Sequence, residues 1–346
     1  MEAGPLPEMD FATFRDQLPA VRYGVWRHSD TIRNEESVNP GFRHPALFYS
    51  GAEDYLAGTV PFVHAGLAAG EPVAVAVPPE NLAVLAGGLG AAAGSVHFLD
   101  MTRVGRNPGR IIPGVLRAFA DAHPGERVRI IGEPVWAART ALEYPACAQH
   151  EALINRAFAG RDVEILCPYD TTTLDDAALR DARATHPVLI SGDKEYDSDE
   201  FDPDEVVARY NLPLPPRPAG AASLPFDVDS MAALRRFVVG EAERHGLREP
   251  KLDNWELMVD ELATNAVRHG AGTGTAHLWA DGGRVWCEVT AGGRIDNPLA
   301  GREPIRVDAE HGRGLLLVNH LADLVRVHTG PATTTVRMCL AVRLDD

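Results

Sequence analysis

The sequence lacks the features that mark a nucleic-acid-binding or membrane protein. It has no run of five or six basic residues, and its 49 acidic residues outnumber the 33 basic ones, for a net charge of −16. This balance argues against direct nucleic-acid binding. The long uncharged stretch 81–99 is mostly Ala and Gly, too weakly apolar to span a bilayer. The amino terminus shows no basic-then-apolar secretion signal. We expect no membrane association.

Cysteine is also scarce. The chain has four, and none of them forms a Cys-x-x-Cys pair: Cys147, Cys167, Cys287 and Cys339. Scattered single cysteines are typical of a reducing compartment. We therefore expect a cytoplasmic protein with reduced thiols.

The chain is long enough for two domains. Residues 1–42 form either a flexible N-terminal arm or an extra element packed on the next domain, and 10–18 could be a short helix. We predict a first domain over 43–191. A linker over 192–223 follows, because 193–205 holds eight carboxylates against one Lys and 211–220 is rich in Pro. The second domain covers 224–346.

The first domain alternates short apolar runs with helical segments. Apolar runs occur at 47–49, 72–77, 96–99, 128–131 and 163–167, with helical patterns between them such as 52–69, 108–122 and 142–158. This alternation predicts an α/β domain with a mainly parallel sheet. No Gly-x4-Gly-Lys-Ser/Thr loop is present, and the Gly-rich 87–94 contains no Lys, so we expect no P-loop.

Polar and aromatic side chains follow the predicted strands or lie on the helix between them. They are His44, Tyr49, Glu133, Trp136, His150, Glu151, Cys167, Tyr169, Asp170 and His186. Since α/β sheets bind ligands at the carboxyl ends of their strands, a small-molecule pocket is the favoured interpretation. Cys147 and His150, three residues apart on a helix, could instead ligate a metal with Cys167 or His44. A purely structural role also stays open, because buried Cys and His are common core residues.

The second domain contains an unusual helix over 253–270. Its apolar residues recur at helical spacing, while Glu261 and Asn265 lie one turn apart on a neighbouring face, with His269 a further turn on. Asn is a poor residue inside a helix, because its amide competes for backbone groups. The pair is either a solvated polar face or a sparse site for hydrated Mg²⁺ and the phosphates it carries.

The rest of this domain predicts an α+β fold, with helices on one face of a mostly antiparallel sheet. A helix at 230–245 comes before the 253–270 helix, and a β-hairpin at 275–290 comes after it. A Gly-rich loop over 292–304 and two strands, 324–329 and 333–340, complete the pattern. Between them, Gly312-Arg313-Gly314 opens a helix whose free backbone N–H groups could bind phosphate.

This order of motifs, over 225–343, resembles the GHKL ATPase superfamily and its anti-sigma-factor serine kinase branch. ELATNAVRHG (261–270) is similar to the N box of that family, and GGRIDNPLAGR (292–302) to its first Gly box. HGRGLLLVN (311–319) is similar to the second Gly box, and ATTTVRM (332–338) to the terminal Thr strand. The resemblance implies an α+β sandwich of the GHKL (Bergerat) ATPase type.

The resemblance also implies ATP and Mg²⁺ as cofactors. Asn265 would be the Mg²⁺ ligand, and Glu261 would orient or deprotonate the acceptor. The nucleotide contacts would be His269, Gly293, Gly312, Arg313, Gly314 and Thr334. One position departs from the family: Ala291 stands where an Asp normally accepts a hydrogen bond from adenine, and Asp296 lies five residues on.

The first domain has its own resemblance. RHPALFYSG (43–51), GEPVWAART (132–140), HEALINRAFAG (150–160) and CPYDTTTL (167–174), with THP (185–187), resemble the MEDS domain. That is a sensory domain of methanogens and methylotrophs, distantly similar to RecA-like folds. The resemblance implies sensing of a small molecule by residues 44–190.

The two resemblances together predict a signalling regulator. The sensory domain would control a GHKL-type anti-sigma factor and serine/threonine protein kinase, whose partner would be a sigma factor or an anti-anti-sigma (STAS-type) protein. The alternative is a non-catalytic module that sequesters a sigma factor, with a degenerate nucleotide site because of Ala291. A structural or dimerising unit without a ligand is a third interpretation, and a homodimer stays open.

Overall fold

The computed structural model describes residues 41–304 and 313–342. Of the predicted N-terminal arm, only 41 and 42 are described, and the predicted helix over 10–18 lies outside the described residues. Gly312 of the predicted phosphate loop lies outside them as well.

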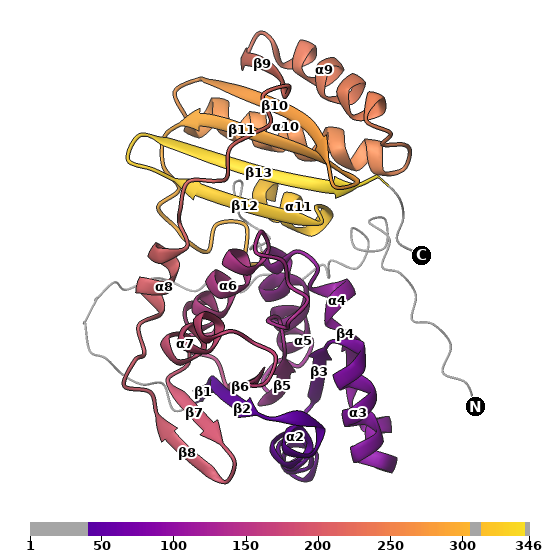
Figure 1. Cartoon of the computed structure of the whole chain (residues 1–346), viewed down its shortest axis with the longest axis vertical. Helices are drawn as coiled ribbons and strands as arrows, with labels where there is room; N and C mark the ends of the chain where they lie inside the picture. The colour runs from indigo at the N-terminus through magenta and orange to yellow at the C-terminus, as the bar shows by residue number, and fades with distance from the viewer. Residues whose placement is uncertain (1–40, 305–312, 343–346) are drawn as a thin grey trace, which may run out of the picture. The chain divides into compact units, whose positions relative to one another are not determined.

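The first domain is built on a mainly parallel sheet, as predicted (Figure 1). Its described strands are β1 (Phe42–Arg43), β2 (Pro45–Tyr49), β3 (Val73–Val77), β4 (His97–Asp100), β5 (Val128–Gly132), β6 (Val163–Asp170), β7 (Val188–Ser191) and β8 (Lys194–Asp197). The order is β4-β3-β5-β6-β2-β7-β8, with β1 also paired to β6. Every pair is parallel except β7–β8.

Helices alternate with these strands. They are α2 (Gly51–Ala68), α3 (Pro79–Leu89), α4 (Met101–Val104), α5 (Arg117–Asp121), α6 (Tyr144–Ala157), α7 (Asp176–Thr185) and α8 (Pro203–Arg209). The segment 108–122 is helical, as predicted, but it is not one continuous α-helix. A 3₁₀ turn (Pro108–Arg110) and a π turn (Ile112–Leu116) precede α5, since Pro lacks an N–H and its ring disturbs the α-helical hydrogen-bond ladder.

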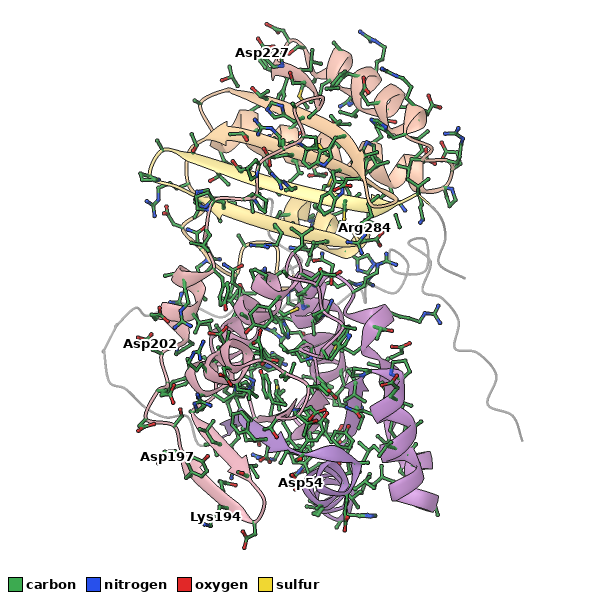
Figure 2. All side chains as sticks on the ribbon, in the orientation of Figure 1. Asp54, Lys194, Asp197, Asp202, Asp227 and Arg284 are labelled. Atoms are coloured by element: carbon green, nitrogen blue, oxygen red, sulfur yellow. The ribbon has the colours of Figure 1, made fainter. Side chains whose placement is uncertain are left out.

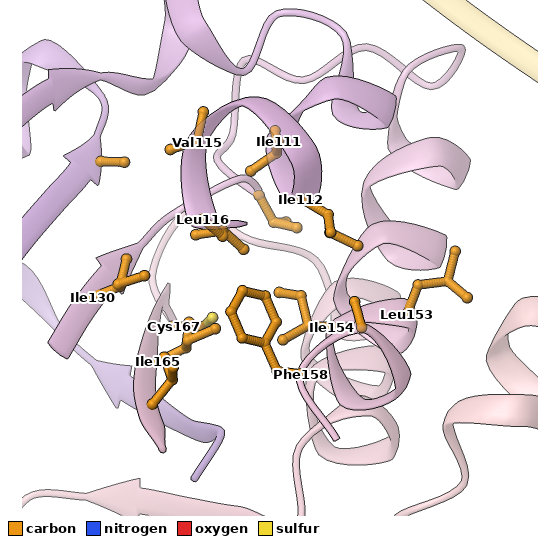
Figure 3. Close-up of a cluster of buried hydrophobic side chains, with 14 of the residues drawn as sticks. Ile111, Ile112, Val115, Leu116, Ile130, Leu153, Ile154, Phe158, Ile165 and Cys167 are labelled. Atoms are coloured by element: carbon orange, nitrogen blue, oxygen red, sulfur yellow. The ribbon is translucent and has the colours of Figure 1, made fainter. Parts of the chain in front are cut away.

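One apolar cluster of the first domain lies between β6 and α6, and a second lies on the other face of the sheet. Ile165 and Cys167 of β6, with Ile154 of α6 and Phe158 just after it, belong to one buried cluster (Figure 3). Strand side chains alternate between the two faces of a sheet, so Glu164 and Leu166 point away from this cluster. Each large side chain buried here contributes roughly 1.5–3 kcal/mol.

The acidic stretch predicted as the first half of a linker instead contains β8 and α8. Asp202 caps α8, its Oδ1 accepting a hydrogen bond from the Glu205 N–H at 3.0 Å, and Val206 is fully buried. The carboxylates of this stretch serve as helix caps and as exposed residues of β8, such as Asp197 (Figure 2). A charge count alone does not distinguish these roles from a solvated spacer.

The second domain is a five-stranded antiparallel sheet with its helices on one face (Figure 1). The strands are β9 (Ala222–Asp227), β10 (Thr273–Asp281), β11 (Arg284–Gly292), β12 (Leu324–Thr329) and β13 (Thr333–Ala341), in the order β12-β13-β11-β10-β9. The helices are α9 (Met231–Arg244), α10 (Lys251–His269) and α11 (Arg313–Leu321). This α+β arrangement confirms the prediction. No described helix of either domain combines the length and the apolar run needed to cross a membrane.

The helices and the inner sheet face share one core. Trp255 of α10 is fully buried, and its indole N–H donates to the Val238 carbonyl of α9 at 3.2 Å. Cys287 and Val289 of β11 face the same core. The apolar stripe predicted for the 253–270 helix therefore packs as expected, which leaves Glu261 and Asn265 at the edge of the core.

The outer sheet face carries a buried ion pair. Glu288 of β11 lies opposite Arg337 of β13, and the Arg337 Nε donates to Glu288 Oε2 at 2.8 Å. The guanidinium also lies 5.1 Å from the Trp279 ring centroid and donates to the Pro215 carbonyl at 2.7 Å. Arg217 pairs with the same carboxylate. The Pro-rich segment predicted as part of the linker thus contacts this face through Pro215 and Arg217.

Candidate functional site

A cavity of about 510 Å³ opens in the second domain between α10 and the ends of β11 and β13. Four of the residues predicted to bind a nucleotide line it: Asn265, His269, Gly293 and Thr334. Leu262, Val289 and Val336 supply apolar wall. The cavity has the size and the mixed lining of a small-molecule or cofactor site.

The start of α11 approaches α10 very closely at Gly314. A Cβ atom on Gly314 would lie 2.5 Å from Glu261 Oε2 and 3.0 Å from Asn265 Nδ2. Only glycine allows this approach without displacing both polar side chains. The structure therefore brings together Glu261, Asn265 and a helix amino terminus, which attracts anions through its free N–H groups and its dipole. Arg313, the first residue of α11, is exposed.

A second glycine shapes the opposite wall. Gly293 has φ +91°, and a Cβ there would lie 2.8 Å from the His269 carbonyl oxygen. Its own carbonyl accepts a hydrogen bond from the Thr334 hydroxyl at 3.1 Å. The positive φ and the close contact explain why a glycine stands here, and the hydrogen bond fixes Thr334 at the cavity.

Ala291 lies in the cavity wall, paired across the sheet with Thr334. Its methyl group offers no hydrogen-bond acceptor. Asp296 does not replace the missing carboxylate, because its side chain is 84% exposed and pairs with Arg294 at 3.4 Å. Asp296 is also absent from the cavity lining. Neither position 291 nor Asp296 therefore places a carboxylate in this part of the cavity.

In the first domain, the structure divides the predicted pocket residues. Tyr49 and Glu133 lie at the carboxyl ends of β2 and β5, as expected. Asn81 of α3 joins them, donating to Glu133 Oε2 at 2.8 Å and to the Tyr49 hydroxyl at 3.0 Å. Asn81 was missed because a single Asn near a helix start is usually a local backbone contact. Asp170 lies opposite Tyr49 at the end of β6.

The Glu133 carboxyl is almost completely buried, with 3% of the residue exposed. Burial raises its pKa to about 8, against the hydrogen bonds from Asn81 and Tyr49, which favour the charged form. Burial and the nearby Glu133 also raise the pKa of the Tyr49 hydroxyl. The buried carboxyl group of this cluster is therefore largely protonated near neutral pH.

Replacing Glu133 with Gln should remove a pH dependence of stability. The folded pKa is about 8 and the unfolded value about 4.5, so between them the folded state binds more protons. Wild-type stability then falls as pH rises through this window, by on the order of 1 kcal/mol per pH unit. The free energies of unfolding of wild type and Glu133→Gln, measured with urea at several pH values, should differ by an amount that changes with this slope. A constant difference would contradict it, and exposed Glu126→Gln is the control.

The other predicted residues gather elsewhere. His44, Glu151, Cys167 and His186 form one fully buried group, here called the His–Cys cluster. Tyr169 packs edge-on against His186, with ring centroids 5.5 Å apart. Trp136 lies apart, under the Arg139 guanidinium at 3.9 Å.

The proposed pairing of Cys147 with His150 is not found. Both residues are buried on α6, but neither belongs to the His–Cys cluster. Burial lowers the pKa of His150 to about 3 and raises that of Cys147 to about 11, so both side chains are neutral. Spacing along one helix does not show which buried side chains meet, because the cluster combines Glu151 of α6 with residues from distant segments.

Comparisons with known proteins agree with this division. The MEDS family model (MEthanogen/methylotroph, DcmR Sensory domain) matches residues 43–187, and the model of the histidine kinase-like ATPase domain matches 224–340. A comparison with curated proteins finds no match.

Two solved structures share local similarity. The histidine kinase AdeS of Acinetobacter baumannii is 10% identical, with 35% of this chain and 68% of that chain covered and a TM-score of 0.21. The hypothetical protein SMU.573 of Streptococcus mutans is 17% identical, with coverages of 49% and 67% and a TM-score of 0.21. Because both TM-scores are low, neither structure supports a fold assignment for this chain. The assignment follows from the family models and the two sheets: the chain joins a MEDS sensory domain to a histidine kinase-like ATPase domain.

Proposed function

We propose that the protein is a cytoplasmic signalling regulator whose MEDS domain controls an anti-sigma-factor kinase of the GHKL type. The observation that carries the proposal is the 510 Å³ cavity, lined by Asn265 and Thr334. Beside it, Glu261 meets the amino terminus of α11 at Gly314. An amide ligand for Mg²⁺, a carboxylate for the acceptor and free N–H groups for phosphate can together support phosphoryl transfer from ATP.

Each residue has a defined task in this proposal. Bound Mg²⁺ would neutralise charge on the phosphates of ATP, with Asn265 as its protein ligand. The α11 amino terminus would hold phosphate oxygens, and Glu261 would orient the acceptor hydroxyl or accept its proton. Thr334 would contact the nucleotide base. The chemistry is then mainly positioning and electrostatic stabilisation.

The partner and the signal belong to the same proposal. The acceptor would be a serine of a STAS-type anti-anti-sigma protein, and a sigma factor would be the bound target. A small molecule at the MEDS domain would control the kinase only if it binds two states of the protein with different affinity.

Ala291 favours one alternative function. If adenine binding has been lost with the family's Asp, the domain would bind and sequester a sigma factor without catalysis. The intact Glu261, Asn265 and Gly314 arrangement favours the enzyme.

Phosphate transfer tests the proposal directly. With labelled ATP and STAS-type proteins from the same genome, wild type should label a serine, and Glu261→Gln should reduce the rate by about 10²–10⁴-fold. Asp260→Asn is the matched control, because Asp260 is the next residue on α10 and makes a surface pair with Arg235 at 2.7 Å. Its rate should be unchanged. Transfer that is undiminished in Glu261→Gln would remove Glu261 from the mechanism, and no transfer by wild type would favour sequestration.

A further inference from the structure

The His–Cys cluster brings together four side chains from four separate parts of the first domain. His44 immediately precedes β2, Glu151 lies on α6, Cys167 lies within β6, and His186 ends α7 before β7. Their exposed fractions are 0%, 1%, 1% and 0% respectively. Three of them are polar groups that a protein core excludes unless they are paired. Their convergence therefore requires an explanation.

The distances within the cluster match those between ligands of one metal ion. Glu151 Oε2 lies 3.4 Å from His44 Nε2 and 3.3 Å from His186 Nε2, and Cys167 Sγ lies 3.4 Å from His44 Nε2. All four candidate ligand atoms lie within 4.8 Å of one another. Around tetrahedral Zn²⁺, bond lengths of about 2.0–2.3 Å place neighbouring ligand atoms roughly 3.3–3.7 Å apart.

Each imidazole is oriented by a hydrogen bond at its other nitrogen. His186 Nδ1 lies 2.8 Å from the Ala182 carbonyl oxygen. His44 Nδ1 lies 3.2 Å from Asn155 Oδ1, while the Asn155 amide N–H donates to the Thr185 carbonyl at 2.8 Å. Both Nδ1 atoms therefore carry a proton, and in the neutral tautomer each Nε2 presents its lone pair to the cluster. Metal-ligating histidines are held in this way.

This arrangement leaves too few protons for the acceptors. Within the described ranges, both Glu151 oxygens and His186 Nε2 are buried without a hydrogen-bond partner. The Cys167 thiol has a single proton and can satisfy only one acceptor. Buried acceptors left unsatisfied are destabilising, and one cation among them would coordinate His186 Nε2 and a Glu151 oxygen together.

We propose that His44, Glu151, Cys167 and His186 bind one Zn²⁺ ion inside the MEDS domain. Two imidazoles, a thiolate and a carboxylate are a borderline-soft ligand set that suits Zn²⁺. The two negative ligands neutralise the ion, so the occupied site carries no net charge among the apolar side chains around Cys167 (Figure 3). With all four positions taken by protein, the site is of the closed, structural kind. It would tie the starts of β2 and β7 to α6 and β6.

Metal analysis of the full-length protein tests this site without any nucleotide. Purified protein should contain about one Zn²⁺ per chain by mass spectrometry. After chelation, added Co²⁺ should produce tetrahedral d–d bands and a thiolate-to-cobalt charge-transfer band in the near ultraviolet, which the Zn²⁺ form lacks. Circular dichroism before and after chelation reports whether the metal-free protein is still folded.

Two cysteine variants locate the metal. Cys167→Ala should lose the charge-transfer band and weaken Zn²⁺ binding by at least about tenfold. Cys147→Ala is the matched control, since it removes another buried thiol outside the cluster. This variant should keep both the charge-transfer band and the wild-type affinity for Zn²⁺. His186→Ala should weaken binding while retaining the thiolate band at saturating Co²⁺. If Cys167→Ala does not fold, the presence or absence of the charge-transfer band in wild-type protein decides whether a thiolate binds the metal.

The proposal is overturned if folded wild-type protein takes up neither Zn²⁺ nor Co²⁺. It is equally overturned if Cys147→Ala, and not Cys167→Ala, loses the thiolate band. Because no step uses ATP, failure here would leave the proposed kinase function standing, and the reverse also holds.

Discussion

Replacing Arg337 with Met should lower the free energy of unfolding by about 3–5 kcal/mol. Arg337 and Glu288 have side chains that are only 6% and 2% exposed, and the substitution would leave the Glu288 carboxylate buried with Arg217 as its remaining partner. Arg217 is 38% exposed, so it is a weaker, more solvent-screened partner. The lower end of the range is therefore expected. Urea unfolding of full-length protein measures the loss.

Two further variants separate the ion pair from simple packing. The double variant Arg337→Met/Glu288→Met removes both charges and should recover most of the loss, since a buried pair and an apolar replacement are often similar in stability. Arg235→Met breaks an exposed pair with Asp260 and should cost less than about 1 kcal/mol. A double variant as unstable as the single one would show that packing around Trp279 is what matters.

Replacing Ala291 with Asp should tighten ATP–Mg²⁺ binding by about ten- to a hundredfold. The methyl group of Ala291 lines the cavity beside Thr334, where a carboxylate could accept a hydrogen bond from the adenine amino group. An unpaired buried donor costs about 1–3 kcal/mol, and each 1.4 kcal/mol is about tenfold in affinity. Isothermal titration calorimetry measures the change. This expectation rests on the proposed nucleotide site.

Controls on either side of the sheet make the result specific. Thr290→Asp places the same carboxylate one residue away, on the opposite face where Thr290 meets Thr335 at 3.2 Å, and should not tighten binding. Asn265→Ala should abolish Mg²⁺-dependent binding. Binding seen only in Ala291→Asp would identify a decayed site and support the sequestering function. Equal affinity in wild type and Ala291→Asp would show that position 291 does not contact adenine.

The second domain was predictable because two of its candidate site residues are close in sequence. Glu261 and Asn265 share one helix, so their spacing alone places them one turn apart. The strands alternate cleanly, so the sheet and its inner face followed from the pattern. The contact of Gly314 with Glu261 and Asn265 was not predictable from spacing, because it depends on how α11 packs against α10.

In the first domain, the candidate residues were less predictable from the sequence. The sequence suggested ten candidate residues, but it did not show how the fold would group them. Tyr49 and Glu133 lie at strand ends as expected, together with Asn81, which no pattern indicated. The His–Cys cluster formed elsewhere, at the beginnings of β2 and β7.

The sequence by itself determined the two-domain organisation, the alternation that makes one sheet parallel and the other antiparallel, and the Glu261–Asn265 pair. These depend on local periodicity, which each segment carries within a few residues. The tertiary structure decided which distant side chains meet: His44 with His186, Gly314 with Glu261, and Arg337 with Glu288. Such contacts depend on strand order, register and helix packing, and these are set by the burial of whole faces rather than by the residues that meet.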